Sequence, residues 1–471
     1  MSQPHSALPE LHSALQARTS LAWLAIAAFF VFLFDPGIMS NDSIASLRQA
    51  RSLEFNDWHP PLKALIWSLL DRMIAGPAGM LLAQSALFAY ASAALCAHAF
   101  PRLSSRFPRW SVVAVFSLFP PAMTLVGMIW KDIWTSGFLL LALVHLFRAR
   151  DALDVAVRRR HAILVVVFCF GATAFRHNAL AATAGLLAGA AYLVLFPKMG
   201  QWLRLFAASV IGVVAAVLLY VGVSLGNGLI AERANPTTAI YLHDIAGVIV
   251  YSGDAENAAN MVLADAGHLT DAPEQFLARI YRSYTPAAAG RIVRTSRRPA
   301  TPFSINVYAL DHDAESVREI HKTLVSKYPL AYLKHRTQAF VCLLQFCERD
   351  TWIYRSYVMN TDYSLPDTLN RESWQYAFRK AVLSPKLAVL YHPGFWLLVT
   401  LVGGALGFAR LGGPRPSLLL FMGLSSAGLA VSLYFTSPIE SFRYLHWTVL
   451  LGWTMLFLAA ERRIEALAAE S

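Results

Sequence analysis

The sequence predicts an all-α polytopic membrane protein with about ten transmembrane helices, interfacial helices and a mostly helical extracytoplasmic domain. Its composition is 56% hydrophobic and 15% charged, whereas soluble domains hold roughly 45–50% apolar and about 25% charged residues. Apolar runs of about 20 residues, long enough to cross a bilayer, recur from Leu21 to Ala460. These two observations exclude an array of soluble domains, and the net charge of +11 fits a basic cytoplasmic face better than nucleic-acid binding.

Ten segments have the apolar length and few charges expected of membrane spans. They are residues 19–38, 77–100, 110–128, 133–147, 161–175, 179–196, 203–225, 387–408, 417–435 and 444–460. Residues 60–75 are also apolar, but they are fewer and include Lys63, Asp71 and Arg72, so we expect a helix that lies at the membrane interface.

The basic residues orient this topology. With a cytoplasmic N-terminus, the loops 101–109, 148–160, 197–204 and 410–416 and the tail from 461 are all cytoplasmic, and all carry Arg or Lys. An eleventh span at 60–75 would destroy this agreement. The chain is therefore expected to lie in the plasma (inner) membrane with both termini inside. It divides into a cytoplasmic N-terminus (1–18), a membrane module (19–225) with its first outer loop at 35–76, an extracytoplasmic domain (226–386), three further spans (387–460) and a cytoplasmic tail (461–471).

The extracytoplasmic domain is expected to be helical, because Val317, Ile320 and Leu324 recur at helical spacing and Leu330, Leu333 and Phe340 continue in a second helix after Pro329. His243 and Asp244 could reach an acceptor at the membrane, although a surface helix is the favoured interpretation. Arg291, Arg294, Arg297 and Arg298 form a basic run, for which a solvated loop is favoured over a site for lipid headgroups or an anionic glycan.

Two smaller features concern packing and oxidation. Cys342 and Cys347 could pair outside the cytoplasm, but a five-residue spacing on one helix would separate them, which favours free thiols.

The small-residue pairs at Gly185 and Gly189, Gly222 and Gly226, and Gly403 and Gly407 suit close packing of helices.

Unusual polar residues gather at the outer ends of the predicted spans rather than inside them. A transporter would more commonly place such groups in the membrane interior. The residues are Asp35, Asp42, Asp57 and His59 after the first span, Lys131 and Asp132 after the third, Arg176, His177 and Asn178 after the fifth, and Glu440, Arg443 and Tyr444 after the ninth. We expect one shared site at the outer face; the alternative is ordinary polar anchoring of helix ends.

The first outer loop carries the clearest motif, with Asp42 followed by a short helical pattern and then by His59-Pro60-Pro61. Asp42 could simply cap that helix, and the His-Pro-Pro run could simply start the next one. The functional alternative is a carboxylate that takes a proton from an acceptor hydroxyl, with His59 binding phosphate or orienting the base.

An acid soon after span one, then His-Pro-Pro opening an interfacial helix, resembles the GT-C superfamily of polytopic glycosyltransferases, which includes protein O-mannosyltransferases and aminoarabinose transferases. The resemblance covers mainly residues 35–178. It implies a GT-C-like fold, a sugar donor on a polyprenyl phosphate, inversion at the anomeric carbon and Asp42 as catalytic base. The family usually has an acidic pair at this point, whereas this chain has Asn41-Asp42.

The chemistry also requires cations for the departing phosphate. Lys131, Arg176 and Arg443 are the candidates, with Asp57, Asp132 and Tyr444 as further substrate-binding residues and Asp42 with His59 as the catalytic pair. A divalent metal on the acids and His59 is conceivable, but no ligand spacing supports one, so no cofactor is predicted.

The function predicted from these residues is transfer of a sugar from a polyprenyl-phosphate donor to a hydroxyl of a lipid, glycan or protein acceptor at the outer membrane face. One alternative is a polymerase or ligase of lipid-linked oligosaccharides. Others from different classes are a transporter or flippase, and a membrane scaffold whose extracytoplasmic domain binds a partner. The sequence shows no P-loop and no dinucleotide fingerprint.

Overall fold

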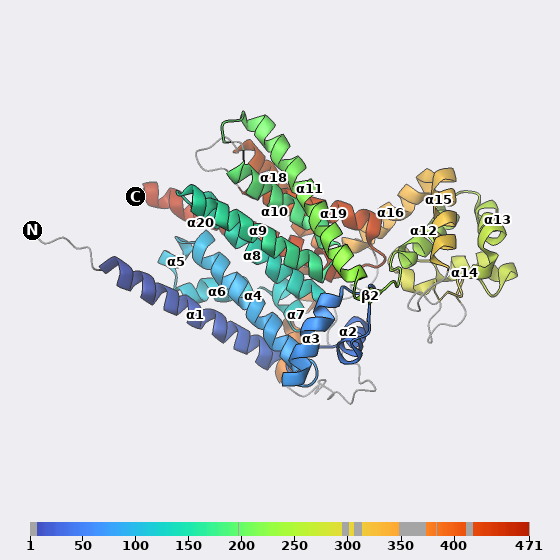
Figure 1. The fold of residues 1–471 in the computed structure, drawn as a ribbon, viewed down its shortest axis with the longest axis horizontal. Coiled ribbons are helices and arrows are strands. Elements are labelled where there is room, and N and C mark those ends of the chain that lie inside the picture. The colour runs from blue at the N-terminus through green and yellow to red at the C-terminus, as the bar shows by residue number, and fades with distance from the viewer. Residues whose placement is uncertain are drawn as a thin grey trace, which may run out of the picture.

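The computed structural model describes residues 7–195, 197–293, 301–305, 313–347, 374–382, 384–410 and 418–470. Long helices form a bundle, and a smaller helical unit is attached to one of its ends (Figure 1). The bundle helices are α1 (Ala7–Phe34), α4 (Ala78–Ala99), α6 (Arg109–Ser117), α7 (Pro120–Val126), α8 (Lys131–Asp151), α9 (Val155–Phe175), α10 (Ala179–Val194), α11 (Gln201–Gly228), α18 (Pro393–Ala409), α19 (Leu419–Thr436) and α20 (His446–Glu470). The short α5 (Leu103–Arg106) lies at the opposite end, where α1 begins and α20 ends (Figure 1).

Within the described residues, four helices are long and apolar enough to cross a membrane, namely α4, α8, α11 and α19. The bent pair α6 and α7 makes a fifth if it is one span, and α10, α18 and the Leu21–Phe34 part of α1 are shorter apolar helices. The chain is thus a helical membrane protein. Every predicted span overlaps a helix, but the number ten stays a prediction.

Prolines explain two departures from the predicted spans. The segment 110–128 is a broken pair with a 73° bend, and α7 starts at Pro120, where a ring without an N–H cannot continue the preceding helix. The segment 387–408 begins as the 3-10 helix η4 (Pro385–Tyr391) and becomes α18 only at Pro393. In both segments a proline therefore marks where a new helix begins.

Small residues let the bundle helices approach closely, as predicted for two of the three glycine pairs. A Cβ on Gly185 would lie 2.3 Å from the backbone nitrogen of Ser425 on α19, and one on Gly407 would lie 2.4 Å from that of Leu420. Gly222 and Gly226 have nothing within 4 Å of such a Cβ. The packing expected from that third pair is therefore absent from the described part of the chain.

The loop at 35–76, which the sequence predicts to be the first outer loop, folds onto the end of the bundle. It forms α2 (Asn41–Ser52), the strand β1 (Phe55–Asn56) and α3 (Pro61–Met73). The interfacial helix predicted at 60–75 matches α3, which is too short to be among the candidate spans. The strand β1 pairs in parallel with β2 (Ala231–Glu232), which follows α11, so the first loop is joined to the start of the appended unit.

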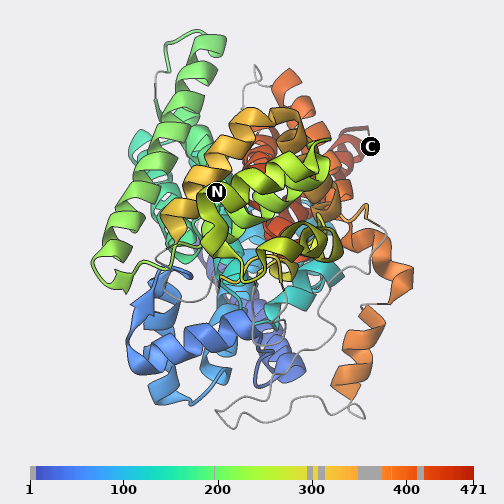
Figure 2. The ribbon, with the colours of Figure 1, turned by 90° about the vertical axis from the view of Figure 1, so that its right-hand side faces the viewer.

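The appended helical unit contains α12 (Thr238–Tyr251), α13 (Ala255–Ala266), α14 (Phe276–Ser283), α15 (Ala314–Lys327) and α16 (Pro329–Leu343), with the 3-10 turns η1 (Gly267–Leu269), η2 (Pro273–Gln275) and η3 (Ala289–Arg291). It has its own apolar core, which includes the predicted Val317, Ile320 and Leu324. Figure 2 looks onto this unit from its free side, with the blue α2 and α3 region below it. After it, α17 (Trp374–Val382) precedes η4.

The second predicted pattern gives the right helix but the wrong buried face. Leu330 and Leu333 are exposed, and the buried side of α16 carries His335 and Arg336. His243 and Asp244 of α12 are also buried, so the expected surface helix was wrong. Of the basic run, Arg294, Arg297 and Arg298 lie outside the described residues.

Cys342 and Cys347 form a disulfide, which corrects the expectation of free thiols. The helix α16 ends at Leu343, and Gln345 adopts a positive φ of 67°. The chain therefore turns back instead of carrying Cys347 around the helix, and the two Cα atoms lie 4.8 Å apart.

Candidate active site

Asp42 and Arg443 form an ion pair at the end of the bundle that carries the appended unit. The Arg443 guanidinium donates to the Asp42 carboxylate at 2.6 Å, across 401 residues of sequence. Asp42 lies in the first turn of α2, and Arg443 lies in η5 (Phe442–Leu445), between α19 and α20. Asp42 does not cap α2, because Ser40 is the N-cap residue and Asp42 lies inside the helix.

His59 and Lys131 complete this contact group. The Nε2 atom of His59 is 3.9 Å from the Asp42 carboxylate. On its other side, Nδ1 of His59 is 3.1 Å from the Lys131 ammonium, which can donate to it. The turn before Pro60 and the start of α8 therefore place His59 between the Asp42 carboxylate and the Lys131 ammonium group.

The electrostatics of the group favour an ionised Asp42. Burial opposes its ionisation, but the charges of Arg443 and Lys131 outweigh burial and hold the pKa of Asp42 well below its usual range. Burial, with the nearby Lys131 charge, lowers the pKa of His59 well below its usual range. His59 is therefore neutral at pH 7 and can accept a proton or a hydrogen bond.

Asp132, Arg176 and Tyr444 form a second contact group beside the first. Arg176 and Asp132 make a close, buried ion pair. The Arg176 guanidinium stacks 4.5 Å from the Tyr444 ring, and the Arg443 guanidinium lies 5.3 Å from the same ring. Both arginines therefore lie close to the Tyr444 ring, and seven of the eight predicted site residues come together at one end of the bundle.

Asp57 is the exception among the predicted site residues. Its backbone N–H donates to Glu232, and its carboxylate accepts from the N–H of Ala234 at 2.6 Å. These contacts extend the pairing of β1 with β2. Asp57 thus fastens the first outer loop to the segment after α11 rather than facing Asp42.

Lys63 and Trp130 also belong to the site, although the sequence did not single them out for it. Lys63 is buried, donates to the Ile129 carbonyl at 2.8 Å and has a pKa lowered to about 7 by burial. The Trp130 ring supports the Arg443 guanidinium at 4.6 Å. The available signal for Lys63 was a lysine in the first turn of an otherwise apolar helix that follows the His-Pro-Pro run.

The assembled side chains hold four basic groups against two carboxylates. Arg443 contacts Asp42, and Arg176 contacts Asp132. Lys131 contacts neutral His59, and Lys63 contacts a backbone carbonyl. A bound anion would favour the charged form of a lysine here, and guanidinium and ammonium groups are the usual ligands of phosphate in proteins.

The acids of the site do not form a group with metal-ligand geometry among the described residues. In the part of the chain that the structure describes, the one group with metal-ligand geometry is Cys342, Cys347 and Glu440, and the disulfide uses both of its thiols. Asp42 is surrounded by cationic side chains, which compete with a metal ion for its oxygens. The prediction of a metal-independent site stays a prediction.

Comparison with known proteins gives little further information. No family model matches the sequence, and no curated protein matches it. Among solved structures, the chain is similar to the crystal structure of ArnT from Cupriavidus metallidurans in the apo state, with 14% sequence identity, a TM-score of 0.31, and coverage of 96% of this chain and 78% of that one. At that identity and TM-score, the likeness assigns neither an activity nor a substrate to this chain.

Proposed function

We propose that this chain is a membrane glycosyltransferase of the GT-C type, which moves a sugar from a polyprenyl-phosphate donor to a hydroxyl of a lipid, glycan or protein acceptor. The observation that carries the proposal is the pairing of Asp42 with Arg443 inside a group that has more basic side chains than acids. A carboxylate next to several basic side chains suits a reaction in which a hydroxyl loses a proton while a phosphate leaves.

In the proposed reaction, Asp42 accepts the proton of the acceptor hydroxyl as its oxygen attacks the anomeric carbon. The bond from that carbon to the phosphate oxygen breaks, and polyprenyl phosphate departs with the bonding electrons. A single displacement inverts the anomeric centre. Lys131, Arg443 and Arg176 would stabilise the negative charge that grows on the leaving phosphate.

The low pKa of Asp42 has a consequence for this scheme. A carboxylate held strongly by Arg443 is a weak base. A donor phosphate that takes over part of the Arg443 charge would raise the pKa of Asp42 and strengthen the base only when donor is bound. Donor binding would in the same way favour the charged form of Lys63, whose pKa is lowered to about 7 in the unliganded protein.

The topology proposed here places this end of the bundle outside the cytoplasm, as the basic loops at the other end indicate. Those loops contain Arg102, Arg150 and Arg462. A disulfide in the appended unit agrees with that side of the membrane, since disulfides persist in oxidising compartments.

The test is mass spectrometry of envelope glycolipids and glycoproteins from three strains that carry the wild-type gene, a D42N gene or a deletion. We expect one sugar-bearing product in the wild type that is missing from the other two, and its mass identifies the sugar class. A product longer by a whole oligosaccharide would indicate the polymerase or ligase alternative. Identical profiles in all three strains would refute the transferase.

A binding measurement tests the phosphate part separately. The purified protein in lipid nanodiscs should bind a polyprenyl monophosphate, and Lys131→Gln should weaken that binding by about tenfold, the effect of one charge-assisted contact. Asp271→Asn, an exposed substitution in the appended unit, is the matched control. Equal affinity in wild type and Lys131→Gln would remove Lys131 from the phosphate site.

A further inference from the structure

The loop that carries Arg443 is held by the appended helical unit. Between α19 and Arg443, the Ser437 carbonyl accepts from the Arg336 guanidinium at 3.1 Å. The Pro438 carbonyl accepts from the N–H of Ala289 at 2.8 Å, and the N–H of Glu440 donates to Ala287 at 2.8 Å. The backbone is therefore tied to the unit at three points just before the residue that pairs with Asp42.

Arg336 is itself fixed by a fully buried acid. Asp244 on α12 lies 2.7 Å from both the Nε and the NH2 group of Arg336 on α16. His321 contacts the same carboxylate at 3.0 Å and His335 at 3.1 Å. With Asp244, Arg336 and His335 almost without exposure, this cluster leaves no room for substrate.

A glycine allows the cluster to form. A Cβ on Gly247 of α12 would lie 2.2 Å from Nδ1 of His335, far inside van der Waals contact. His335 also accepts at Nδ1 from the Tyr284 hydroxyl at 2.7 Å. Any side chain at position 247 would displace His335 and with it the donors around Asp244.

The same unit also holds the other half of the site. The strand β1 and Asp57 bond to the backbone of residues 231–234, and Trp58 packs against the apolar core of the unit. His59 follows directly in the chain. The loops that supply His59 and Arg443 are thus both attached to one body.

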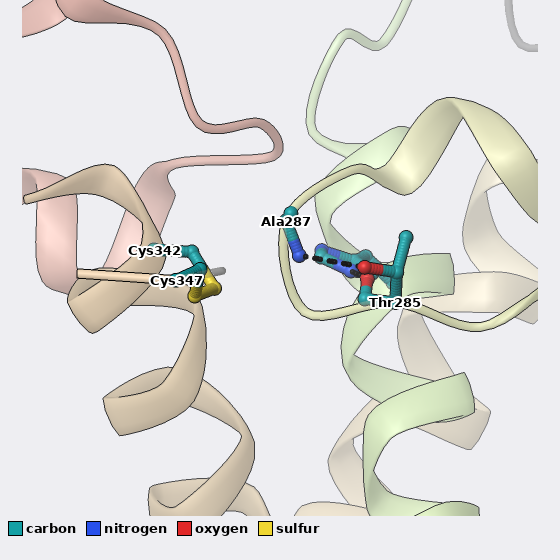
Figure 3. The surroundings of a disulfide bond; sticks show 5 residues. Thr285, Ala287, Cys342 and Cys347 are labelled. Carbon is teal, nitrogen blue, oxygen red and sulfur yellow. Dashed lines mark hydrogen bonds between the residues drawn. A yellow bond between two sulfur atoms is a disulfide. The ribbon is translucent and has the colours of Figure 1, made fainter. Parts of the chain in front are cut away.

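The disulfide lies at this junction as well. It closes the end of α16, and Figure 3 shows it across from the turn at Thr285 and Ala287, where the Ala287 N–H donates to the Thr285 hydroxyl. A carboxylate oxygen of Glu440 lies within 4.8 Å of both sulfur atoms. The end of α16 that follows Arg336 is therefore covalently closed beside the loop that Arg336 holds.

We propose that Arg336 is a positioning residue for the transfer reaction: through the Ser437–Glu440 backbone it holds Arg443 against Asp42, and Asp244 and His335 keep Arg336 in place. The inference rests on the proposed function. It assigns the appended unit a role in catalysis without any contact between Arg336 and substrate.

The experiment uses a matched pair of glycine variants in the full-length protein. Gly247→Ala displaces His335, whereas a Cβ on Gly267, at the end of α13 with helical φ, meets nothing within 4 Å. We expect Gly247→Ala to lower product per folded protein by about tenfold or more, as small misplacements of catalytic groups do. Gly267→Ala should stay within about twofold of the wild type, because surface changes of this kind have small effects.

A double-mutant cycle distinguishes positioning from general damage. Arg443→Lys keeps a cation and measurable turnover, and in that background Gly247→Ala should cause less than about a twofold further loss, because the group it positions has changed. The same factor of loss in both backgrounds would overturn the proposal. Wild-type turnover of Arg443→Lys and Arg443→Gln would instead count against the proposed phosphate role of Arg443.

Hydrogen exchange gives an answer that does not depend on any activity. In Gly247→Ala, and in Arg336→Lys as the second variant, the amides of Ala289 and Glu440 should exchange at least about tenfold faster than in the wild type, because they bridge the unit and the loop. Unchanged exchange of both amides in both variants would overturn the proposal. If the Gly247→Ala protein does not accumulate in the membrane, hydrogen exchange of the same two amides in Arg336→Lys tests the proposal.

Discussion

Two clusters built from an acid, an arginine and histidine contact the Ser437–Arg443 loop, and they differ in exposure. The Asp42 side chain is 31% exposed and contacts Arg443 closely, with His59 at 3.9 Å. The Asp244 side chain is 2% exposed and is surrounded by Arg336, His321 and His335. The enclosed acid is closed off from solvent by these three side chains, whereas the open acid can still accept a proton from a ligand. Similar residue types therefore suit a structural role in one place and chemistry in the other.

The largest expected effect is on turnover at the open acid. Asp42→Asn removes the base but keeps the shape, so transfer should fall by about 10²–10⁴-fold while the amount of protein in the membrane stays the same. The measurement is product per unit of protein by mass spectrometry. The control is Asp71→Asn in α3, because the Asp71 carboxylate pairs with Arg51 instead of Arg443. Wild-type transfer by Asp42→Asn would remove the acid from the mechanism.

The enclosed acid should instead control stability. Asp244→Asn leaves the Arg336 charge buried without its partner, which costs on the order of 3 kcal/mol of unfolding free energy. The expected result is a lower midpoint in thermal denaturation of the detergent-solubilised protein and less protein in the membrane. If Asp244→Asn is as stable as the wild type, the Asp244 cluster does not have the structural role that distinguishes it from the Asp42 cluster.

The pH dependence of turnover tests how Arg443 tunes the open acid. Since the folded pKa of Asp42 is depressed, its ionised pair with Arg443 is fully present above the unfolded pKa of about 4 and is lost only as pH falls through the lower folded value. Arg443→Gln removes the positive charge that contributes most to lowering the pKa of Asp42. The substitution should therefore raise this pKa and move the acid limb of the pH–rate profile to higher pH. An acid limb at the same pH in both proteins would mean that Asp42 does not set it.

The smallest effect is expected outside both clusters. The pair of Arg279 with Asp271 lies at the surface of the appended unit. Asp271→Asn should change the unfolding free energy by no more than about 1 kcal/mol and leave turnover unchanged, because solvent screens an exposed pair. A change in turnover here would indicate that any substitution in the appended unit alters turnover. The effects of substitutions in the two clusters could then not be compared.

Local signals in the sequence predicted that most of the candidate site residues lie close together, as the structure has them. Asp42, His59, Lys131 and Arg443 each lie in or beside a connection between apolar helices, and these connections meet at one end of the helical bundle. Asp57 satisfies the same rule but pairs with the backbone of Ala234. The pattern could not foresee β1–β2 pairing, because two-residue strands leave almost no trace in composition.

The Asp244 cluster could not be predicted for a different reason. The apolar residues Leu330 and Leu333 suggested one buried face for α16, and the structure buries His335 and Arg336 instead. That choice depends on Gly247 in α12, about 90 residues earlier, which leaves space for the His335 ring. The disulfide similarly depends on where α16 ends, which the spacing of the cysteines does not reveal.

The pairing of Asp42 with a residue 401 positions later has a consequence for biosynthesis. The ribosome completes the first outer loop early, but its arginine partner emerges only with the last helix of the bundle. A nascent or truncated chain thus has Asp42 without its counter-charge. Under the proposed function, competence for transfer is acquired only when α20 has been inserted, and the protein does not consume donor during its own synthesis.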